Sequence, residues 1–274
     1  MNTTTMNVEI RELRTLEEFQ RCVDIQKEVW GFDDPFDVVP LPLLVVSERN
    51  DGIVLGGFAG KEMVGFVYSL PGFHQGRKVQ WSHMLAVIPP YRNSDIGYQL
   101  KMAQYQMAQK NGYELIEWTF DPLESRNAHF NLKKLGCIAK EYEVNIYGET
   151  SSPLHQGTPT DRFVAHWIIP PLQKTLPEWT DIPEHALVTR SAHFPDGAVL
   201  IEEVNLVMED EFLFVEIPTE MQMVKAHSKD AALQWRLQTR EIFLHYFQKG
   251  YVAYSFIYRR EFQPPHGFYV LRKL

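Results

Sequence analysis

Several residues that could do chemistry fall within one short segment, residues 85–97. There an apolar run, expected to be a strand, leads into a polar loop that opens an amphipathic helix. The backbone N–H groups of such a loop and the positive end of the helix dipole suit a pyrophosphate. Every connection from a strand to a helix exposes a helix N-terminus, so the segment by itself leaves an ordinary connection open as the alternative.

Two side chains on predicted strands could accept a proton. His83 lies on the first strand, and an imidazole with a pKa of about 6.5 suits a general base at neutral pH. Glu117 lies on the second strand and is the other candidate for the base. The alternatives are a hydrogen-bonded strand histidine without a catalytic part, and a strand carboxylate that faces solvent or a structural arginine.

Three further polar side chains follow or flank the second of these strands, where open α/β sheets tend to bind ligands. They are Asp121, Asn127 and Tyr142. Asn127 either contacts a ligand or caps the helix that follows. Tyr142 either donates a proton as a general acid or packs as an aromatic.

A basic group lies in the second half of the chain. Trp235, Arg236 and Arg240 share one predicted helix. They form either a solvated basic face that packs through its tryptophan, or a contact for a substrate carboxylate or a second subunit.

The histidines and cysteines predict no metal site and no disulfide scaffold. His155, His166 and His193 are scattered without paired spacing. Cys22 and Cys137 are the only cysteines, which fits a reducing compartment. Cys137 could in principle carry an acyl group, but we expect a small buried hydrophobe there.

The composition is that of a packed globular protein with one large domain or two ordinary ones. Its 274 residues are 45% hydrophobic and 23% charged. The net charge of −8 repels a phosphate backbone, so nucleic acid is not an expected partner. Residues 1–14 lack the apolar core of a secretory signal, and the apolar stretch 38–46 is short and interrupted by prolines. We therefore expect no membrane partner and a cytoplasmic location.

Apolar periodicity predicts the elements that must position these residues. A capping box of Thr15 and Glu18 opens a helix over 16–30. Two β-rich runs with a tight connection form a hairpin, and Pro89-Pro90 stops the strand that follows. These three strands are 53–59, 63–70 and 79–87.

A stripe of apolar residues from Ile96 predicts an amphipathic helix that ends at Asn111-Gly112. A strand over 114–120 follows. Strand, helix and strand in this order place the two strands parallel in one sheet. A helix over 127–135 and strands over 143–147 and 162–169 come next.

The stretch 170–183 is rich in proline and predicts a linker or domain edge. Beyond it a strand at 212–217, a helical stretch at 219–249 and a strand at 251–258 repeat the order strand, helix, strand. This order is a weak indication of a pseudo-repeat.

Residues Leu85, Val87, Pro89, Arg92 and Gly97 resemble, in type and spacing, the acyl-CoA signature of the GNAT (GCN5-related) acyltransferases. The resemblance extends over about residues 8–170. The runs 118–123 and 126–129 look like a less-studied branch of predicted acyltransferases in this superfamily. The resemblance implies an α/β (mixed α+β) fold with a twisted mixed sheet and flanking helices.

The resemblance also implies acetyl-CoA or another acyl-CoA as co-substrate. Its backbone contacts near Val87 would polarise the thioester carbonyl. The residues that the resemblance assigns to acyl-CoA are Leu85, Val87, Arg92, Asn93, Ser94, Asp95, Ile96, Gly97 and Asn127.

Two positions depart from the family pattern. Asp95 stands where the family usually has its first loop glycine, so its carboxylate either faces the phosphates or caps the helix. Leu132 stands where many members have a tyrosine that protonates the departing thiolate. Acyl transfer does not require that acid, because positioning and backbone donors can supply most of the rate.

These observations predict an N-acyltransferase that moves an acetyl or other short acyl group from acyl-CoA to a small-molecule amine, with an amino acid as one acceptor. The predicted domains are a GNAT-like acyl-CoA-binding domain at 1–170 and a C-terminal α/β region at 171–274. The alternatives are a non-catalytic acyl-CoA-binding or regulatory module and a protein lysine acetyltransferase. A homodimer also stays open.

Overall fold

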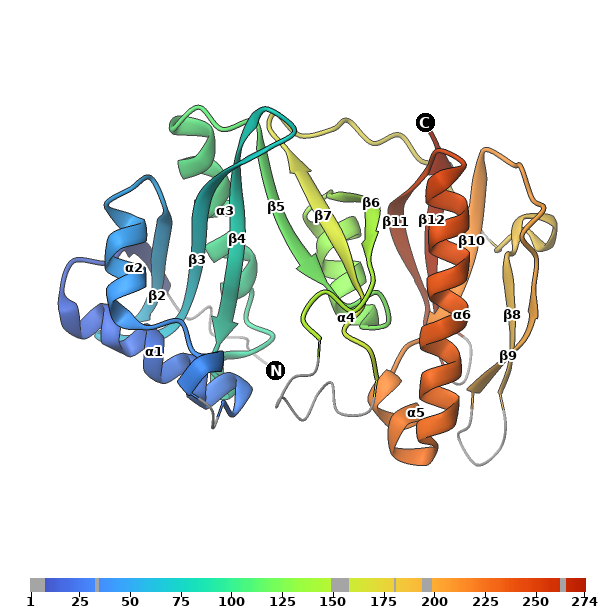
Figure 1. Ribbon diagram of the computed structural model, residues 1–274, viewed down its shortest axis with the longest axis horizontal. Helices are drawn as coiled ribbons and strands as arrows, with labels where there is room; N and C mark the ends of the chain where they lie inside the picture. Colours follow the sequence, from blue (N-terminus) through green and yellow to red (C-terminus); the bar gives the residue numbers. More distant parts are fainter. Residues whose placement is uncertain (1–7, 33–34, 149–157, 180, 194–198, 262–264) are drawn as a thin grey trace. The chain divides into compact units, whose positions relative to one another are not determined.

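The computed structural model describes residues 8–32, 35–148, 158–179, 181–193, 199–261 and 265–274 (Figure 1). Its contacts divide the chain into two compact units. The first unit contains residues 1–118 and 168–170, and the second contains 119–167 and 171–274. We predicted a boundary after residue 170, whereas the contacts group residues 119–167 with the C-terminal part of the chain.

The first unit is built on a twisted sheet with the strand order β1-β2-β3-β4-β5. Neighbouring strands are antiparallel, except that β4 and β5 are parallel, as the strand, helix, strand order predicted. The fold class is therefore mixed α/β, as predicted. The strands are β1 (Val8–Glu12), β2 (Ile53–Ala59), β3 (Glu62–His74), β4 (Arg77–Val87) and β5 (Leu115–Phe120), the last two residues of which belong to the second unit.

Helices cover both faces of this sheet. α1 (Leu16–Trp30) and α2 (Leu41–Glu48) lie on one face, and α3 (Ile96–Lys110) lies on the other (Figure 1). The predicted capping box opens α1, because Thr15 Oγ1 accepts from Glu18 N and the Glu18 carboxylate accepts from Thr15 N. α3 ends where Gly112 takes a positive φ of 75°, a conformation that glycine adopts without a steric penalty.

The second unit has its own antiparallel strands in the order β7-β6-β11-β12-β10. A separate hairpin pairs β8 with β9. These strands are β6 (Ile138–Glu143), β7 (Arg162–Ile168), β8 (Thr189–His193), β9 (Val199–Val204), β10 (Phe212–Pro218), β11 (Tyr251–Arg259) and β12 (His266–Lys273).

The helices of the second unit are α4 (Ser125–Ala128), the π-helical turn η3 (His129–Lys134), α5 (Met221–His227) and α6 (Lys229–Gln248). Ser228 caps α6 by accepting from Ala231 N. The core of this unit is aromatic. The Phe163 ring lies edge-on to Phe243 at a centroid distance of 4.6 Å and to Tyr269 at 5.4 Å.

Three predicted elements differ from the structure. The strand predicted at 143–147 is wrong, because the strand in this region is β6, which ends at Glu143. The helix predicted at 127–135 begins at Ser125 and changes to π-helical geometry at His129. The strand predicted at 63–70 continues to His74, which lengthens the β3–β4 hairpin.

The order strand, helix, strand does recur in the second unit, as β10, α5 with α6, and β11. There, however, β12 lies between β10 and β11 and pairs with both of them. In the first unit the corresponding strands β4 and β5 pair directly. The pseudo-repeat stays a prediction.

Candidate active site

The parallel strands β4 and β5 stay together for only three residue pairs. The described ladder joins Val79 to Leu115 and ends at the pair of Trp81 and Glu117. Directly after this point β4 carries a β-bulge, because Tyr68 of β3 is opposite Met84 while Ser69 is opposite Ser82. The extra residue of the bulge is His83. An extra residue bends its strand, which separates the rest of β4 from β5.

A buried polar network lies on the α3 side of this divergence. Lys101 of α3 is 2% exposed, and its Nζ donates to Ser82 Oγ at 3.0 Å and to Gln104 Oε1 at 2.9 Å. The same ammonium lies 3.5 Å from the centre of the Trp118 ring. Lysine is almost never fully buried unless it is paired, so this network fixes α3 against both strands.

The loop between β4 and α3 has the backbone of an anion site. Asn93 and Asp95 have positive φ values of 64° and 61°. Residues in the left-handed region turn successive N–H groups toward one side, and such concavities bind anions. Arg92 Nε donates to the Val87 carbonyl at 3.2 Å, and Ser94 Oγ donates to the Tyr91 carbonyl, so side chains hold the loop in place.

Asp95 precedes α3, but its side chain makes no capping hydrogen bond. The helix-capping alternative for Asp95 is therefore not what the structure has. Its backbone is left-handed, with a φ of 61°, a conformation that glycine adopts without strain.

The structure brings the signature residues Leu85, Val87 and Gly97 together. A Cβ added to Gly97 would lie 3.9 Å from Leu85 Cδ2 and 4.0 Å from Val87 Cγ2. The first turn of α3 therefore packs on the last residues of β4. Ile96 is buried beside it at 1% exposure.

His83 is exposed at the bulge, and its ring lies edge-on to the Tyr68 ring at 6.0 Å. The Tyr68 hydroxyl bonds to Ser47 of α2, so this ring pair lies on the face that α1 and α2 cover. Desolvation against the surrounding protein lowers the pKa of His83 below its ordinary value, although the ring edge reaches solvent. His83 is therefore neutral at neutral pH, which is the state of a proton acceptor.

Glu117 is buried, not solvent-facing, and it has a partner that sequence reasoning missed. Its side chain is 1% exposed, and both carboxylate oxygens lie 2.9 Å from His74 Nδ1. The neighbouring Trp118 faces α3, so strand alternation directs Glu117 to the other face, the one where His83 lies. His74 lies beyond the predicted end of its strand, and for that reason its role could not be read from the sequence.

Three predicted residues belong to the second unit. Tyr142 is buried and donates its hydroxyl to Asp161 Oδ2 at 2.7 Å, and burial raises its pKa well above the ordinary value. Asn127 is exposed on α4 and does not cap it, because the residue before the helix is Glu124. Leu132, at the position of the family tyrosine, is 1% exposed.

The basic group on α6 is not solvated. Trp235 is 1% exposed and donates its indole N–H to the Val199 carbonyl, and Arg236 is 3% exposed. Arg240 is partly buried and pairs with Asp161. The solvated alternative is therefore wrong for Arg236.

The predicted cysteines and histidines have ordinary structural environments where the chain is described. Cys22 and Cys137 are buried free thiols, and burial raises the pKa of Cys22. His166 is buried beside Glu141, with 3.2 Å between Nε2 and Oε1. His155 lies outside the described residues. Within the described part, no group of three or more His, Cys, Asp or Glu could hold a metal ion.

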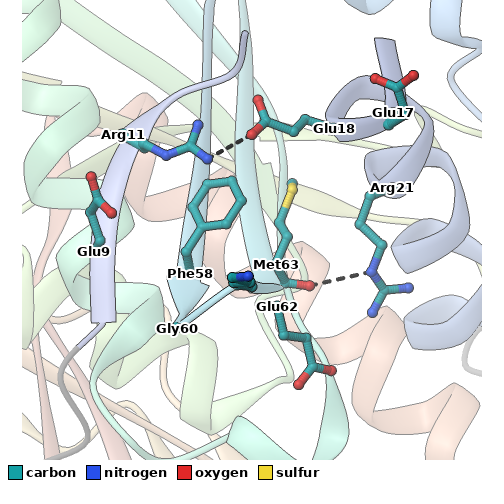
Figure 2. Close-up of a pocket in the computed structure, with 10 residues that line it drawn as sticks. Glu9, Arg11, Glu17, Glu18, Arg21, Phe58, Gly60, Glu62 and Met63 are labelled. Atoms are coloured by element: carbon teal, nitrogen blue, oxygen red, sulfur yellow. Dashed lines mark hydrogen bonds and ion pairs between the residues drawn. The ribbon is translucent and has the colours of Figure 1, made fainter. Parts of the chain in front are cut away.

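A shallow hollow of about 500 Å³ lies between α1 and the β2–β3 turn (Figure 2). Two of its arginines have partners within the lining. Arg11 Nη2 lies 2.6 Å from Glu18 Oε1 and its guanidinium stacks 3.8 Å over Phe58, while Arg21 donates to the Met63 carbonyl. We assign this hollow no ligand.

No helix in the described part of the chain is both long enough and apolar enough to cross a membrane. No protein-family model matches the chain, and no curated protein matches it in sequence.

In structure the chain is similar to GNAT acetyltransferases. One is the acetyltransferase of the GNAT family from Streptococcus pneumoniae, with 16% identity, 59% of this chain and 99% of that chain covered, and a TM-score of 0.49. The ribosomal-protein-S18-alanine N-acetyltransferase from Escherichia coli has 13% identity and a TM-score of 0.47, and the match covers 63% of this chain and 100% of that chain. The PaiA N-acetyltransferase from Thermoplasma acidophilum, in complex with coenzyme A, has 19% identity, coverages of 59% and 98%, and a TM-score of 0.41. Each of the three leaves more than a third of this chain without a counterpart.

Proposed function

We propose that this chain is an acyl-CoA-dependent N-acyltransferase of the GNAT type that acylates a small-molecule amine. The observation that carries the proposal is the separation of the parallel strands β4 and β5 after Trp81 and Glu117, next to a loop with left-handed residues at the start of α3. An unpaired strand edge and a loop of N–H donors are the features that a long thioester with a pyrophosphate needs.

Each part of the site has a role in this proposal. The N–H groups of residues 92–97 bind the phosphates, and the free edge of β4 at Leu85 and Val87 binds the arm that carries the acyl group. Acyl-CoA would supply the activated acyl group. Backbone N–H near Val87 polarises the thioester carbonyl, and the bond from nitrogen to carbon forms as the bond from sulfur to carbon breaks.

Proton transfer needs an acceptor for the amine proton. His83 is the first candidate, because its lowered pKa and exposed ring leave a neutral nitrogen at the bulge. Glu117, joined to His74, is the second candidate on the same face of the sheet. Tyr142 stays a predicted acid: its raised pKa keeps it protonated at neutral pH, but its proton is shared with Asp161.

A non-catalytic acyl-CoA-binding module is the second candidate function. It is favoured by the buried Leu132 where the family has its acid and by the carboxylate of Asp95 in the phosphate loop. We keep the cytoplasm as the proposed location, supported by the free thiols of Cys22 and Cys137. An amino acid acceptor and a protein lysine acceptor are the finer alternatives for the enzyme.

Release of free thiol from acetyl-CoA, measured with a panel of amines that includes amino acids and a lysine peptide, tests the proposal. We expect saturable turnover with at least one small amine. Saturable binding of acetyl-CoA without turnover for any acceptor or acyl chain would favour the module instead. Turnover confined to the peptide would move the acceptor to protein lysine.

A further inference from the structure

The second unit contains a buried cluster of charged residues that the proposed acyl transfer does not use. We call Asp121, Asp161, Arg162, Arg236 and Arg240 the arginine cluster. Its members come from the segment after β5, from the start of β7 and from α6. All except Arg240 are under 9% exposed as residues, so water contributes little to their solvation.

Two of the arginines have acceptors in place. Arg240 donates two hydrogen bonds to the Asp161 carboxylate, from Nε to Oδ2 at 2.8 Å and from Nη2 to Oδ1 at 2.9 Å. Arg162 Nη1 donates to the Asp161 carbonyl at 2.8 Å and lies 3.6 Å from Asp121 Oδ2. Paired in this way, Arg240 has the planar, two-pronged geometry that makes arginine a strong carboxylate ligand.

Arg236 is different, because most of its donors are unused. Nη2 donates to Asp121 Oδ2 at 2.6 Å, whereas nothing among the described residues accepts from Nε or Nη1. A guanidinium has five N–H groups, so one on Nε and two on Nη1 have no acceptor. Asp121 accepts from Arg236 Nη2 at Oδ2 and from Leu123 N at Oδ1, and neither oxygen is within hydrogen-bond reach of Nε or Nη1. Unused donors this deep are rare in native proteins and call for a ligand or an ordered water.

The charges around Arg236 point to an anion. The groups near enough to affect its pKa or those of its neighbours include Glu124 and Lys225 as well as the arginine cluster. Glu220 and Lys229 act on Glu124 and Lys225 in turn, so these described groups comprise five cationic side chains and four acidic ones. Gln222 already donates to Glu124. Burial raises the pKa of the Glu124 carboxyl, which disfavours the negative charge that would balance Arg236.

We propose that Arg236 binds the carboxylate group of a small molecule within the arginine cluster. Nε–H and the N–H groups of Nη1 are without an acceptor among the described residues, and a carboxylate oxygen in the plane of the guanidinium could accept from them. Because Arg236 is 3% exposed, the proposal is confined to small carboxylates. The inference does not depend on acyl transfer, because carboxylate binding is measured directly.

Calorimetric titration of the full chain with sodium acetate and with L-alanine tests this site. Acetamide, which has the shape of acetate without the charge, is the matched control ligand, and sodium chloride controls for ionic strength. We expect saturable binding of at least one carboxylate and none of acetamide. Arg236→Lys keeps the charge but loses the planar fork, so we expect binding to weaken by roughly 10- to 100-fold.

Arg190→Lys is the matched control variant, because it makes the same substitution in the second unit at an exposed arginine outside the arginine cluster, which pairs with Glu184 and Glu203. It should bind the carboxylate as the unchanged protein does. Circular dichroism reports folding of each variant, and Arg236→Gln combined with Asp121→Asn replaces Arg236→Lys if that variant does not fold. Absence of saturation by both carboxylates, equal affinity in the Arg236 variant, or equal binding of acetamide would overturn the assignment, leaving Arg236 with an ordered water.

Discussion

At the scale of single residues, burial decides which candidates can move a proton. His83 and Glu117 lie on one face of the sheet beside the point where β4 and β5 separate. His83 reaches solvent with a lowered pKa, whereas Glu117 is 1% exposed and already has His74 as its partner. An amine that arrives from solvent therefore meets the imidazole more easily than the carboxylate.

His83→Gln should remove the acidic limb of the pH profile of kcat/KM. In the unchanged protein the limb should lie below the ordinary histidine pKa, because desolvation lowers the pKa of His83. We expect kcat to fall by roughly 10²-fold, the low end for loss of a general base, with unchanged acetyl-CoA affinity. An unaltered pH profile in the variant would show that His83 is structural, and Glu117→Gln would then be the next test.

Asp95→Gly should tighten acetyl-CoA binding without loss of stability. The change removes a negative charge near the proposed phosphate site and relieves a left-handed backbone, and no side-chain cap is lost. The free energy of unfolding should stay equal or rise by up to about 1 kcal/mol. An acetyl-CoA titration and a denaturant melt measure the two effects.

Two further variants separate the effect of the Asp95 charge on acetyl-CoA affinity from the effect of the left-handed backbone. Asp95→Asn removes the charge alone and should also tighten binding. Asn93→Gly relieves the other left-handed residue of the loop without changing its charge, so affinity should not change. Weaker binding in Asp95→Gly at normal stability would contradict the assignment of this loop to phosphate.

The sequence could predict positions that follow from local backbone structure, but not contacts that depend on long-range packing. Leu85, Val87 and Gly97 were predictable because their positions follow from one strand, one loop and one helix. Lys101 was missed, since nothing local shows that a lysine on α3 meets Ser82 and Trp118 from two separate strands.

At the scale of elements, helices with a clear apolar periodicity and clear end signals were predicted with the correct bounds. Elements without such signals were missed. α1 and α3 have the predicted bounds, because a capping box and a left-handed glycine mark their ends. α2 was missed, since its apolar residues surround a proline and show no polar face. The short strands β1, β8 and β9 were missed as well, because five or six residues carry little periodic signal.

Gly97→Glu should weaken acetyl-CoA binding strongly, because it adds a negative side chain to the first turn of α3, where we propose that the phosphates bind. Gly97→Ala is the matched control. Its Cβ would meet only Leu85 and Val87, at 3.9 and 4.0 Å, so the alanine variant should fold and bind acetyl-CoA nearly as well. Equal affinity in a folded glutamate variant would place the phosphates elsewhere.

At the scale of the whole molecule, local sequence signals do not show which distant segments of the chain pack together. The proline-rich stretch is a real break in regular structure, but residues 119–167 belong with the C-terminal unit through contacts such as Arg240 with Asp161 and Tyr269 with Pro122. These pairs are separated by 79 and 147 residues, a range over which composition and periodicity carry no information.

Within that unit, Lys174 fastens the proline-rich stretch to distant parts of the chain. Its Nζ donates to the carbonyls of Leu132, Cys137 and Tyr254 at 3.2, 2.6 and 2.5 Å. Lys174→Met should therefore lower the free energy of unfolding, by about 1–3 kcal/mol near neutral pH, because three buried carbonyls lose a donor. Denaturant-induced unfolding of both proteins measures this loss of unfolding free energy.

The difference in unfolding free energy between the unchanged protein and Lys174→Met should depend on pH. Burial lowers the pKa of Lys174 from its ordinary value of 10.5 to about 8, even though three carbonyls favour its ammonium form. Between these values the unfolded chain binds more protons than the folded one, so the contribution of Lys174 to stability rises with pH. The difference in unfolding free energy between the unchanged protein and Lys174→Met should grow across this window, by up to about 3 kcal/mol. Lys140→Met, which alters an exposed lysine of β6, is the control and should show no such growth. If the difference for Lys174→Met stays constant or decreases over this pH range, the proposed burial of the Lys174 ammonium is wrong.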